Sequence, residues 1–200
     1  MKKLEESQGR LRYLSAEEEQ RLLAVATEPL RTIILVGIYT GLRIAAEALT
    51  LRWENIDLRK GLLTVESAYA KGKETSTLPL NRKLVDALTE QRARSKGEFV
   101  FVSRKGTPYR SVRTPFDNAC RRAKLEDVSL HTLRHTFASK LAEQRVGDRT
   151  LQTLGRWKEP KMIQRYAHLS EEHLREAVEK IASNSPTIFT TPSSRAPLSD

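Results

Sequence analysis

Apolar positions in the first forty residues recur at helical spacing. Ser15 and Glu18 form a capping box ahead of an apolar face at residues 22–25, so a helix is predicted to begin at Ser15. A nearly continuous apolar run follows at residues 33–38, and Gly41 stands just beyond it. This pattern predicts a second, mostly buried helix that starts afresh after a proline and ends at the glycine.

The pattern changes in the next forty residues. Residues 43–52 are predicted to be helical again, and short runs rich in β-branched and aliphatic residues follow at 56–58, 62–65 and 75–80. Gly72 lies between the last two runs, where a glycine tolerates the positive φ of a hairpin tip. Lys71 and Lys73 are therefore predicted to lie on a β-hairpin.

The second half of the chain is predicted to be mostly helical. The predicted helices cover residues 81–94, 112–124 and 131–144, then a segment from 148 or 150, and one from 159–160 running into Tyr166; a short strand is expected at 99–102. Leu174, Ala177, Val178 and Ile181 form a narrow apolar stripe on a last helix. The predicted fold class is mainly α with a small antiparallel β-sheet (α+β).

Composition adds a partner class. The 200 residues carry 35 Lys and Arg against 25 Asp and Glu, a formal net charge of +10. A surplus of positive charge attracts polyanions, which makes nucleic acid the leading partner, with an ordinary basic surface as the alternative. The single cysteine, Cys120, excludes an internal disulfide. The chain has no apolar stretch long enough for a membrane span or a secretory signal, so we expect a cytoplasmic protein with no membrane partner.

One domain is expected over residues 1–182, followed by a tail at 183–200. The tail is rich in Ser, Thr and Pro and has too few apolar residues to bury a core, so it is predicted to be disordered.

Three residues match the needs of phosphodiester chemistry. Arg43 and Arg134 are candidates to bind the oxygens of a phosphate, because guanidinium groups are the best planar donors for them. His131 precedes Arg134 by three residues and would share its helical face. His135 completes a spacing seen in zinc sites, but the glutamate of that motif is missing, so we expect no metal and interpret His135 as a packing residue.

Three segments resemble the conserved boxes of the tyrosine site-specific recombinases, the phage-integrase family. The first is Thr40-Gly41-Leu42-Arg43 with Glu47 and Trp53; the second is His131-Thr132-Leu133-Arg134-His135; the third runs from Leu154-Gly155-Arg156-Trp157 to Arg165-Tyr166. The resemblance covers about residues 12–182 and implies the catalytic-domain fold of that family.

The resemblance implies a role for each matching residue. Tyr166 would be the nucleophile of a DNA strand exchange, Arg43 and Arg134 the arginine pair and His131 their companion. Trp157 stands where most members have His and some have Trp, and its role would be binding and packing because an indole cannot shuttle a proton. The hairpin lysine would be Lys71, eight residues before Pro79, with Lys73 as the second choice. No cofactor or metal is implied.

The resemblance also implies the partners. These are double-stranded DNA and other recombinase protomers, which the apolar stripe of the last helix would contact. The family's N-terminal core-binding domain is expected to be absent, because only about fourteen residues precede the first predicted helix.

One departure from the family concerns Glu47. It lies four residues after Arg43, whereas family members usually place the acidic residue three after it. An extra residue turns a helix by about 100°, so it has to be absorbed before Glu47 for the downstream apolar face to keep its direction. Glu47 is therefore only a supporting candidate, and His135, interpreted above as a packing residue, is another.

Two other functions remain open from the sequence. The chain could be a non-cleaving DNA-binding remnant or accessory module of the same fold, which would tolerate Tyr166→Phe. A metal-dependent nuclease is disfavoured because no carboxylate cluster of the kind that holds magnesium is evident.

Overall fold

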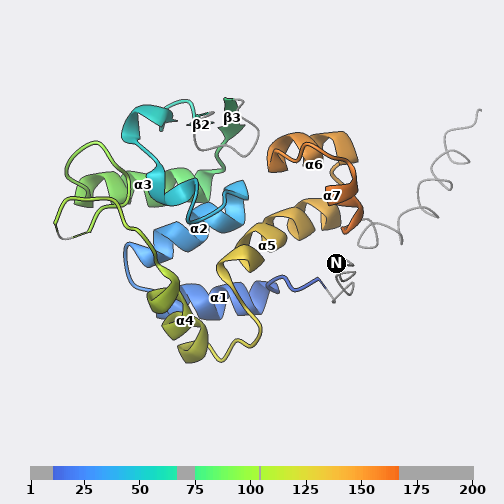
Figure 1. Ribbon diagram of the computed structural model, residues 1–200, viewed down its shortest axis with the longest axis horizontal. Coiled ribbons are helices and arrows are strands. Elements are labelled where there is room, and N and C mark those ends of the chain that lie inside the picture. Colours follow the sequence, from blue (N-terminus) through green and yellow to red (C-terminus); the bar gives the residue numbers. More distant parts are fainter. Residues whose placement is uncertain (1–10, 67–74, 104, 167–200) are drawn as a thin grey trace, which may run out of the picture.

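The computed structural model of the chain describes residues 11–66, 75–103 and 105–166, and it is mainly helical with one small antiparallel sheet (Figure 1). This confirms the predicted fold class. The helices are α1 (Ala16–Val25), α2 (Leu30–Thr40), α3 (Arg82–Arg94), α4 (Arg113–Arg122), α5 (Leu130–Glu143), α6 (Asp148–Gly155) and α7 (Lys161–Gln164). Two short 3-10 helices, η1 (Ala48–Thr50) and η2 (Trp53–Asn55), precede the strands β1 (Ile56–Asp57), β2 (Leu62–Val65) and β3 (Ser76–Pro79).

Helix α2 forms the centre of the core because its residues are apolar on almost every face. Nine of its eleven residues are buried. A helix that is hydrophobic all round is stable only when other elements surround it, and α2 packs chiefly against α5 and α3. Burial of each large aliphatic side chain contributes about 1.5–3 kcal/mol, so this packing fixes the position of the end of α2 and of the loop after it.

The three predicted strands pair in the order β1-β2-β3, all antiparallel. Leu63 lies opposite Leu78, and both are buried, as is Val65. The alternation of buried and partly exposed residues along β2 is that of a sheet with one covered face. The predicted hairpin tip with Lys71 and Lys73, the apolar stripe at 174–181 and the tail at 183–200 lie outside the described residues.

Most predicted helix boundaries are confirmed to within one or two residues. Ser15 and Glu18 form the reciprocal capping box in front of α1. Asn81 caps α3 by accepting a hydrogen bond from the backbone N–H of Leu84. Helix α6 begins at Asp148, directly after Gly147.

The predicted helix over residues 43–52 is wrong. Arg43 O accepts hydrogen bonds from the backbone N–H groups of both Glu47 and Ala48, and Ile44 O accepts from Leu49 N–H. Two of these three bonds span five residues, the spacing of a π-type turn rather than of an α-helix. This wide turn absorbs one extra residue between Arg43 and η1, so the apolar side chains downstream still face the core.

Two smaller expectations also need correction. Residues 99–102 form no strand: Phe99 bridges Arg52 and Val102 bridges Pro108, each as an isolated pair. The helix predicted from residues 159–160 to Tyr166 is only one turn, α7, and Tyr166 lies in the turn that follows it. Both segments are short connections, and their conformation is determined by tertiary contacts rather than by a repeating local pattern of residues.

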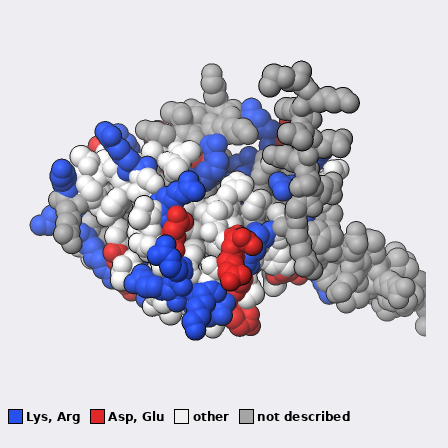
Figure 2. All heavy atoms as spheres, turned by 60° about the horizontal axis from the view of Figure 1, so that its bottom comes forward, with Lys and Arg blue, Asp and Glu red and all other residues white. Residues whose placement is uncertain are grey.

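Basic and acidic side chains are interspersed on the face shown in Figure 2, so charge alone does not single out a binding surface there. Within the described ranges, no helix is both long and apolar enough to cross a membrane.

Candidate active site

Arg134 is a buried cation that connects two helix ends. It projects from α5 and is 9% exposed. One terminal nitrogen donates to Gly155 O, at the end of α6, over 2.6 Å, and the other donates to Gly41 O, at the end of α2. The last carbonyl groups of a helix lack intrahelical donors and carry partial negative charge, so they suit a guanidinium. Burial lowers the pKa of Arg134 to about 10, and it stays protonated at neutral pH.

Both carbonyl groups belong to glycines that no other residue could replace without movement. Gly41 has a left-handed φ of 65°, and a Cβ there would come within 2.5 Å of the Phe137 ring. At Gly155 a Cβ would lie only 1.8 Å from the Trp157 ring. These close approaches bring α2, α5 and the end of α6 together around Arg134.

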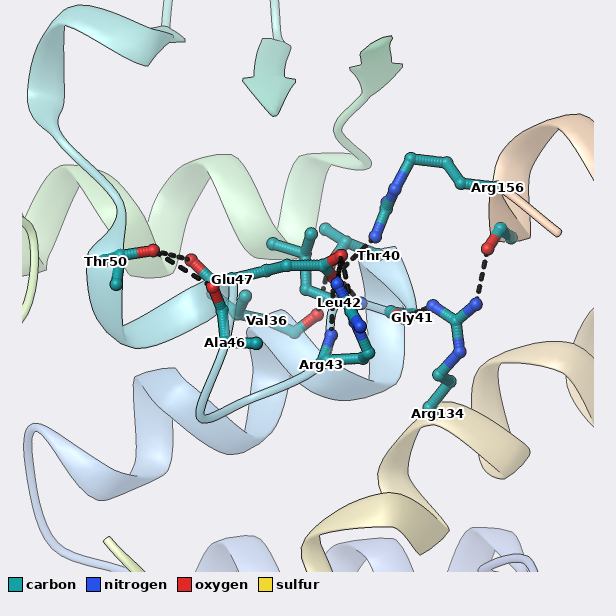
Figure 3. A network of polar contacts seen from close by, with 11 residues as sticks. Val36, Thr40, Gly41, Leu42, Arg43, Ala46, Glu47, Thr50, Arg134 and Arg156 are labelled. Atoms are coloured by element: carbon teal, nitrogen blue, oxygen red, sulfur yellow. Dashed lines mark hydrogen bonds and ion pairs between the residues drawn. The ribbon is translucent and has the colours of Figure 1, made fainter. Parts of the chain in front are cut away.

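Glu47 is a buried carboxylate held by two arginines. It is 4% exposed. Its Oε1 accepts from Arg43 Nε at 3.1 Å and from the Arg43 terminal nitrogen at 2.9 Å, while Oε2 accepts from the Arg43 backbone N–H at 2.8 Å and from Arg156 at 2.7 Å (Figure 3). The wide turn after Arg43 lets this carboxylate fold back onto the start of its own segment. The extra residue therefore does not remove Glu47 from the site.

Arg156 is the residue that the sequence reasoning missed. It is the C-cap of α6 in the left-handed conformation, with φ 54° and ψ 40°, and its side chain is only 11% exposed. In Figure 3 it reaches from the end of α6 toward Glu47. A third arginine beside a glycine, directly before Trp157, was the available signal, but its direction depends on a backbone conformation that the sequence does not reveal.

Tyr166 is 3% exposed and lies against Trp157, with ring centroids 5.9 Å apart. Its hydroxyl is hydrogen-bonded to His135 Nδ1 at 2.8 Å. Burial raises the pKa of Tyr166, and the positive charges of Arg134 and Arg165 oppose that rise. Burial lowers the pKa of His135 to about 4, so its imidazole is neutral at pH 7. His135 thus packs against the neighbouring rings, as expected, and its ring is also hydrogen-bonded to the tyrosine hydroxyl, which fits a supporting residue of the site.

His131 lies at the edge of the same cluster. Its ring packs edge-on against His135 with centroids 4.6 Å apart. The side chain reaches the surface, yet enough protein surrounds the ring for desolvation to lower the pKa of His131, and the charge of Arg134 lowers it further. His131 and His135 are thus two neutral imidazoles in series, and the second of them contacts Tyr166.

These side chains line one cleft of about 610 Å³. The Trp157 ring contacts both Arg134 and Tyr166. The Arg134 guanidinium stacks on this ring at 4.7 Å, and the Tyr166 ring packs against it. The cleft is lined by Arg43, Glu47, Thr75, Ser76, His131, Arg134, His135, Gln152, Thr153, Arg156, Trp157, Lys158, Glu159, Met162, Arg165 and Tyr166. Five of these residues are basic and two are acidic, so the cleft suits an anion.

The structure thus brings together seven of the eight residues singled out from the sequence: Arg43, Glu47, His131, Arg134, His135, Trp157 and Tyr166. The eighth, Lys71, lies outside the described residues, as does Lys73. Thr75 and Ser76, at the start of β3, line the cleft only four and five positions after Lys71. Among residues 11–66, 75–103 and 105–166, no three or more His, Cys, Asp or Glu side chains gather in a way that could hold a metal ion.

The described helical domain thus places four arginines, a histidine pair and a buried tyrosine on one cleft, a set of side chains that suits the binding of a phosphate group. The sequence model of the phage integrase family matches residues 12–173, and the chain belongs to this family.

Individual relatives agree with this assignment. The integrase of Salmonella phage P22 is 32% identical over 187 residues, 87% of this chain and 48% of that protein. Tyrosine recombinase XerC of Xanthomonas axonopodis pv. citri is 34% identical over 172 residues, 80% of this chain and 55% of that protein. The chain therefore spans about half the length of the curated relatives it matches.

Solved structures show the same fold. The catalytic domain of bacteriophage HP1 integrase superposes with a TM-score of 0.68 and 27% identity, covering 87% of this chain and 98% of that one. The XerA recombinase gives a TM-score of 0.71 and 25% identity, covering 84% of this chain and 64% of that one.

Proposed function

We propose that this chain cleaves and rejoins DNA strands at specific sites through a 3′-phosphotyrosyl intermediate. The observation that carries the proposal is the convergence of the Tyr166 hydroxyl and the guanidinium groups of Arg43 and Arg134 on one cleft. The names of its relatives, integrase and tyrosine recombinase, support the same chemistry.

In the proposed reaction the Tyr166 oxygen attacks the scissile phosphorus. A bond forms between phosphorus and the tyrosine oxygen, and the bond to the 5′-oxygen breaks, so the phosphodiester energy is conserved in the protein–DNA link. Attack by the 5′-hydroxyl of a partner strand reverses these steps and releases Tyr166. Arg43 and Arg134 stabilise the charge that develops on the non-bridging oxygens.

The proton of Tyr166 needs an acceptor, and the two histidines are placed to assist. In the tautomer with its proton on Nε2, the neutral His135 ring accepts the hydroxyl hydrogen bond at Nδ1 and orients the oxygen, although a group with a pKa of about 4 is a weak base. His131, edge-on to His135, assists proton movement at the tyrosine. Trp157 supplies a surface on which Arg134 and Tyr166 both pack.

Lys71 is proposed to protonate the leaving 5′-oxygen, with Lys73 as the alternative. Support comes from the position of Thr75 on the cleft wall, because a chain of four residues spans at most about 14 Å. A lysine ammonium has a proton to give, and its flexible stem can extend toward the phosphate.

The proposed partners are double-stranded DNA and further copies of the chain on that DNA, with residues 1–182 as the catalytic domain and the reaction in the cytoplasm. The apolar stripe at Leu174, Val178 and Ile181 suits docking of one protomer on the next. Deletion of residues 170–200 is expected to reduce assembly on DNA, measured by sedimentation; unchanged assembly would remove this part of the proposal.

The decisive experiment traps the covalent intermediate. The protein is incubated with nicked suicide duplexes taken from its own genomic flanks, and a denaturing gel is used to detect a protein–DNA adduct. Wild-type protein is expected to form the adduct and Tyr166→Phe to form none, because phenylalanine lacks the attacking oxygen.

The control for chain length is a relative's N-terminal domain, supplied in trans or fused ahead of residue 11. Bound DNA without an adduct, even with this domain present, would favour the non-cleaving DNA-binding module instead.

A further inference from the structure

We propose that Arg156 is a third phosphate-binding arginine of the cleft, whose guanidinium contacts a non-bridging oxygen of the scissile phosphate. The inference rests on the proposed function, because it assigns a new catalytic residue to that reaction. It starts from the geometry of the two arginines that share Glu47 and of Arg134 in the same cleft.

Basic side chains outnumber acidic ones among the described residues of the cleft lining. Arg43 and Arg156 share Glu47, at 2.9 and 2.7 Å, and Arg134 donates to the carbonyl groups of Gly41 and Gly155, which carry only partial charges. Burial raises the pKa of Tyr166, so its hydroxyl stays protonated at neutral pH and supplies no negative charge. Basic side chains that line a cleft together and are partly buried favour the binding of an anion.

The hydrogen bonds of Arg156 leave a donor available for that anion. One terminal nitrogen is used by Glu47. The other, Nη1, is buried and has no hydrogen-bond partner in the part of the chain that the structure describes. A buried charged donor without a partner is costly, and such a donor on the wall of a cleft is expected to be satisfied by a ligand.

The backbone conformation of Arg156 supports the same inference. Its φ of 54° lies in the left-handed region, which glycine adopts more readily than arginine. Glycine would cap the end of α6 in this conformation with less strain, so the arginine is expected to act through its guanidinium.

A purely structural role is the alternative. Arg156 could serve only to hold Glu47, and through it Arg43. The two roles differ in whether another cation can replace Arg156: a lysine that pairs with Glu47 suffices for the structural role, whereas a direct contact with the phosphate also requires the planar guanidinium.

The test compares Arg156→Gly with Arg145→Gly. Arg145 also has a left-handed φ, 61°, and it is exposed outside the cleft lining, so both variants lose one positive charge and relax one left-handed residue. Arg156→Lys is the second variant. Lys124 has φ 54° in this chain, so lysine fits that conformation, and it keeps an ion pair with Glu47 but lacks the planar fork.

On phosphodiester suicide substrates Arg156→Gly is expected to lower the rate of adduct formation by about 100-fold or more, the usual effect of removing one donor to a developing oxyanion. Arg156→Lys is expected to fall between it and wild type, and Arg145→Gly to stay within about twofold of wild type. On a duplex with a methylphosphonate at the scissile position, the deficit of Arg156→Gly relative to wild type should shrink to less than about tenfold. Equal deficits on both substrates, a wild-type rate, or full activity of the lysine variant would overturn the inference.

A measurement without cleavage separates this inference from the proposed function. Inorganic phosphate at constant ionic strength is expected to raise the melting temperature of wild-type protein and of Arg145→Gly, and to raise that of Arg156→Gly clearly less. If wild type forms no adduct but this difference is seen, the proposed reaction fails and the anion contact of Arg156 stands. If all three proteins respond equally to phosphate, the contact is refuted whatever the cleavage assay gives.

Discussion

Two buried glutamates in this protein look alike in the sequence and differ in what surrounds them. Glu19 and Glu47 are each 4% exposed, and each is paired with two cationic side chains. The partners of Glu19 are Lys140 and Lys83, and Tyr39 donates to it at 2.8 Å, so the cluster ties α1, α2, α3 and α5 together. The partners of Glu47 are Arg43 and Arg156, which line the cleft.

The two glutamates differ in where their cationic partners lie. Lys83 and Lys140 keep 59% and 35% of their side chains exposed, so water completes their hydrogen bonds. Arg43 and Arg156 are 31% and 11% exposed, and they face a cleft that also holds Arg134 and Tyr166. A buried carboxylate that pairs with hydrated lysines stabilises the fold, whereas one that orients arginines in a cleft prepares a binding site.

The largest expected effect is that of a substitution at Glu47, the glutamate of the cleft, on the rate of the reaction. Glu47→Gln should lower the rate of covalent adduct formation about 100-fold, because an error of about 1 Å in the placement of Arg43 and Arg156 has an effect of that size. The rate is measured on suicide duplexes at saturating protein. Glu19→Gln serves as the control in the same assay, and an equal loss in both variants would show that the two carboxylates do not differ in function.

A smaller effect, on stability, is expected from a substitution at Glu19, the glutamate that connects the helices. Glu19→Gln should lower the free energy of unfolding by about 2 kcal/mol, because Lys140 and Tyr39 lose a charged acceptor. Cleavage per folded molecule should stay within about twofold of wild type. Urea unfolding followed by circular dichroism measures the first quantity and active-site titration the second; a stable Glu19→Gln protein with impaired cleavage would reverse the assignment.

The smallest effect concerns pH. The pKa of His135 is lowered to about 4, below the usual value of 6.5, so between these values the unfolded chain binds a proton that the folded chain excludes. Stability is therefore full above pH 6.5 and falls as the pH drops toward 4. His135→Asn should flatten this fall, measured by urea unfolding at pH 7 and pH 5, and His131→Asn should flatten it less. Identical pH profiles for wild type and His135→Asn would contradict the burial of a neutral imidazole.

The elements predicted correctly are those whose pattern is local and repeats. The apolar run of α2, the capping box of α1, the Asn81 cap of α3 and the alternation in β2 each follow from neighbouring residues. The segment after Arg43 was mistaken for a helix because its composition suits one. The wide turn there is stabilised by the Glu47 side chain, which accepts a hydrogen bond from the Arg43 backbone N–H and another from Arg156, 109 residues away.

In the candidate site, too, features that depend on neighbouring residues were predicted, and contacts between distant residues were not. Arg43, Arg134, Trp157 and Tyr166 were found because each stands in a motif of adjacent residues. The link between His135 and Tyr166 joins residues 31 positions apart, and that between Arg156 and Glu47 joins residues 109 apart, so neither could be read from spacing. The role of Arg156 depends further on a left-handed backbone angle at the end of α6.

By itself, then, the sequence determined the helical class, the small sheet, the family and the residue types able to bind a phosphate. These depend on periodicity and on motifs a few residues long, which can be recognised in the sequence alone. Only the tertiary structure decided which carboxylate orients arginines, which imidazole contacts the tyrosine and which third arginine reaches the cleft. Those choices depend on the packing of α2, α5 and α6 against one another, where a glycine without a Cβ and one left-handed residue fix the direction of charged side chains.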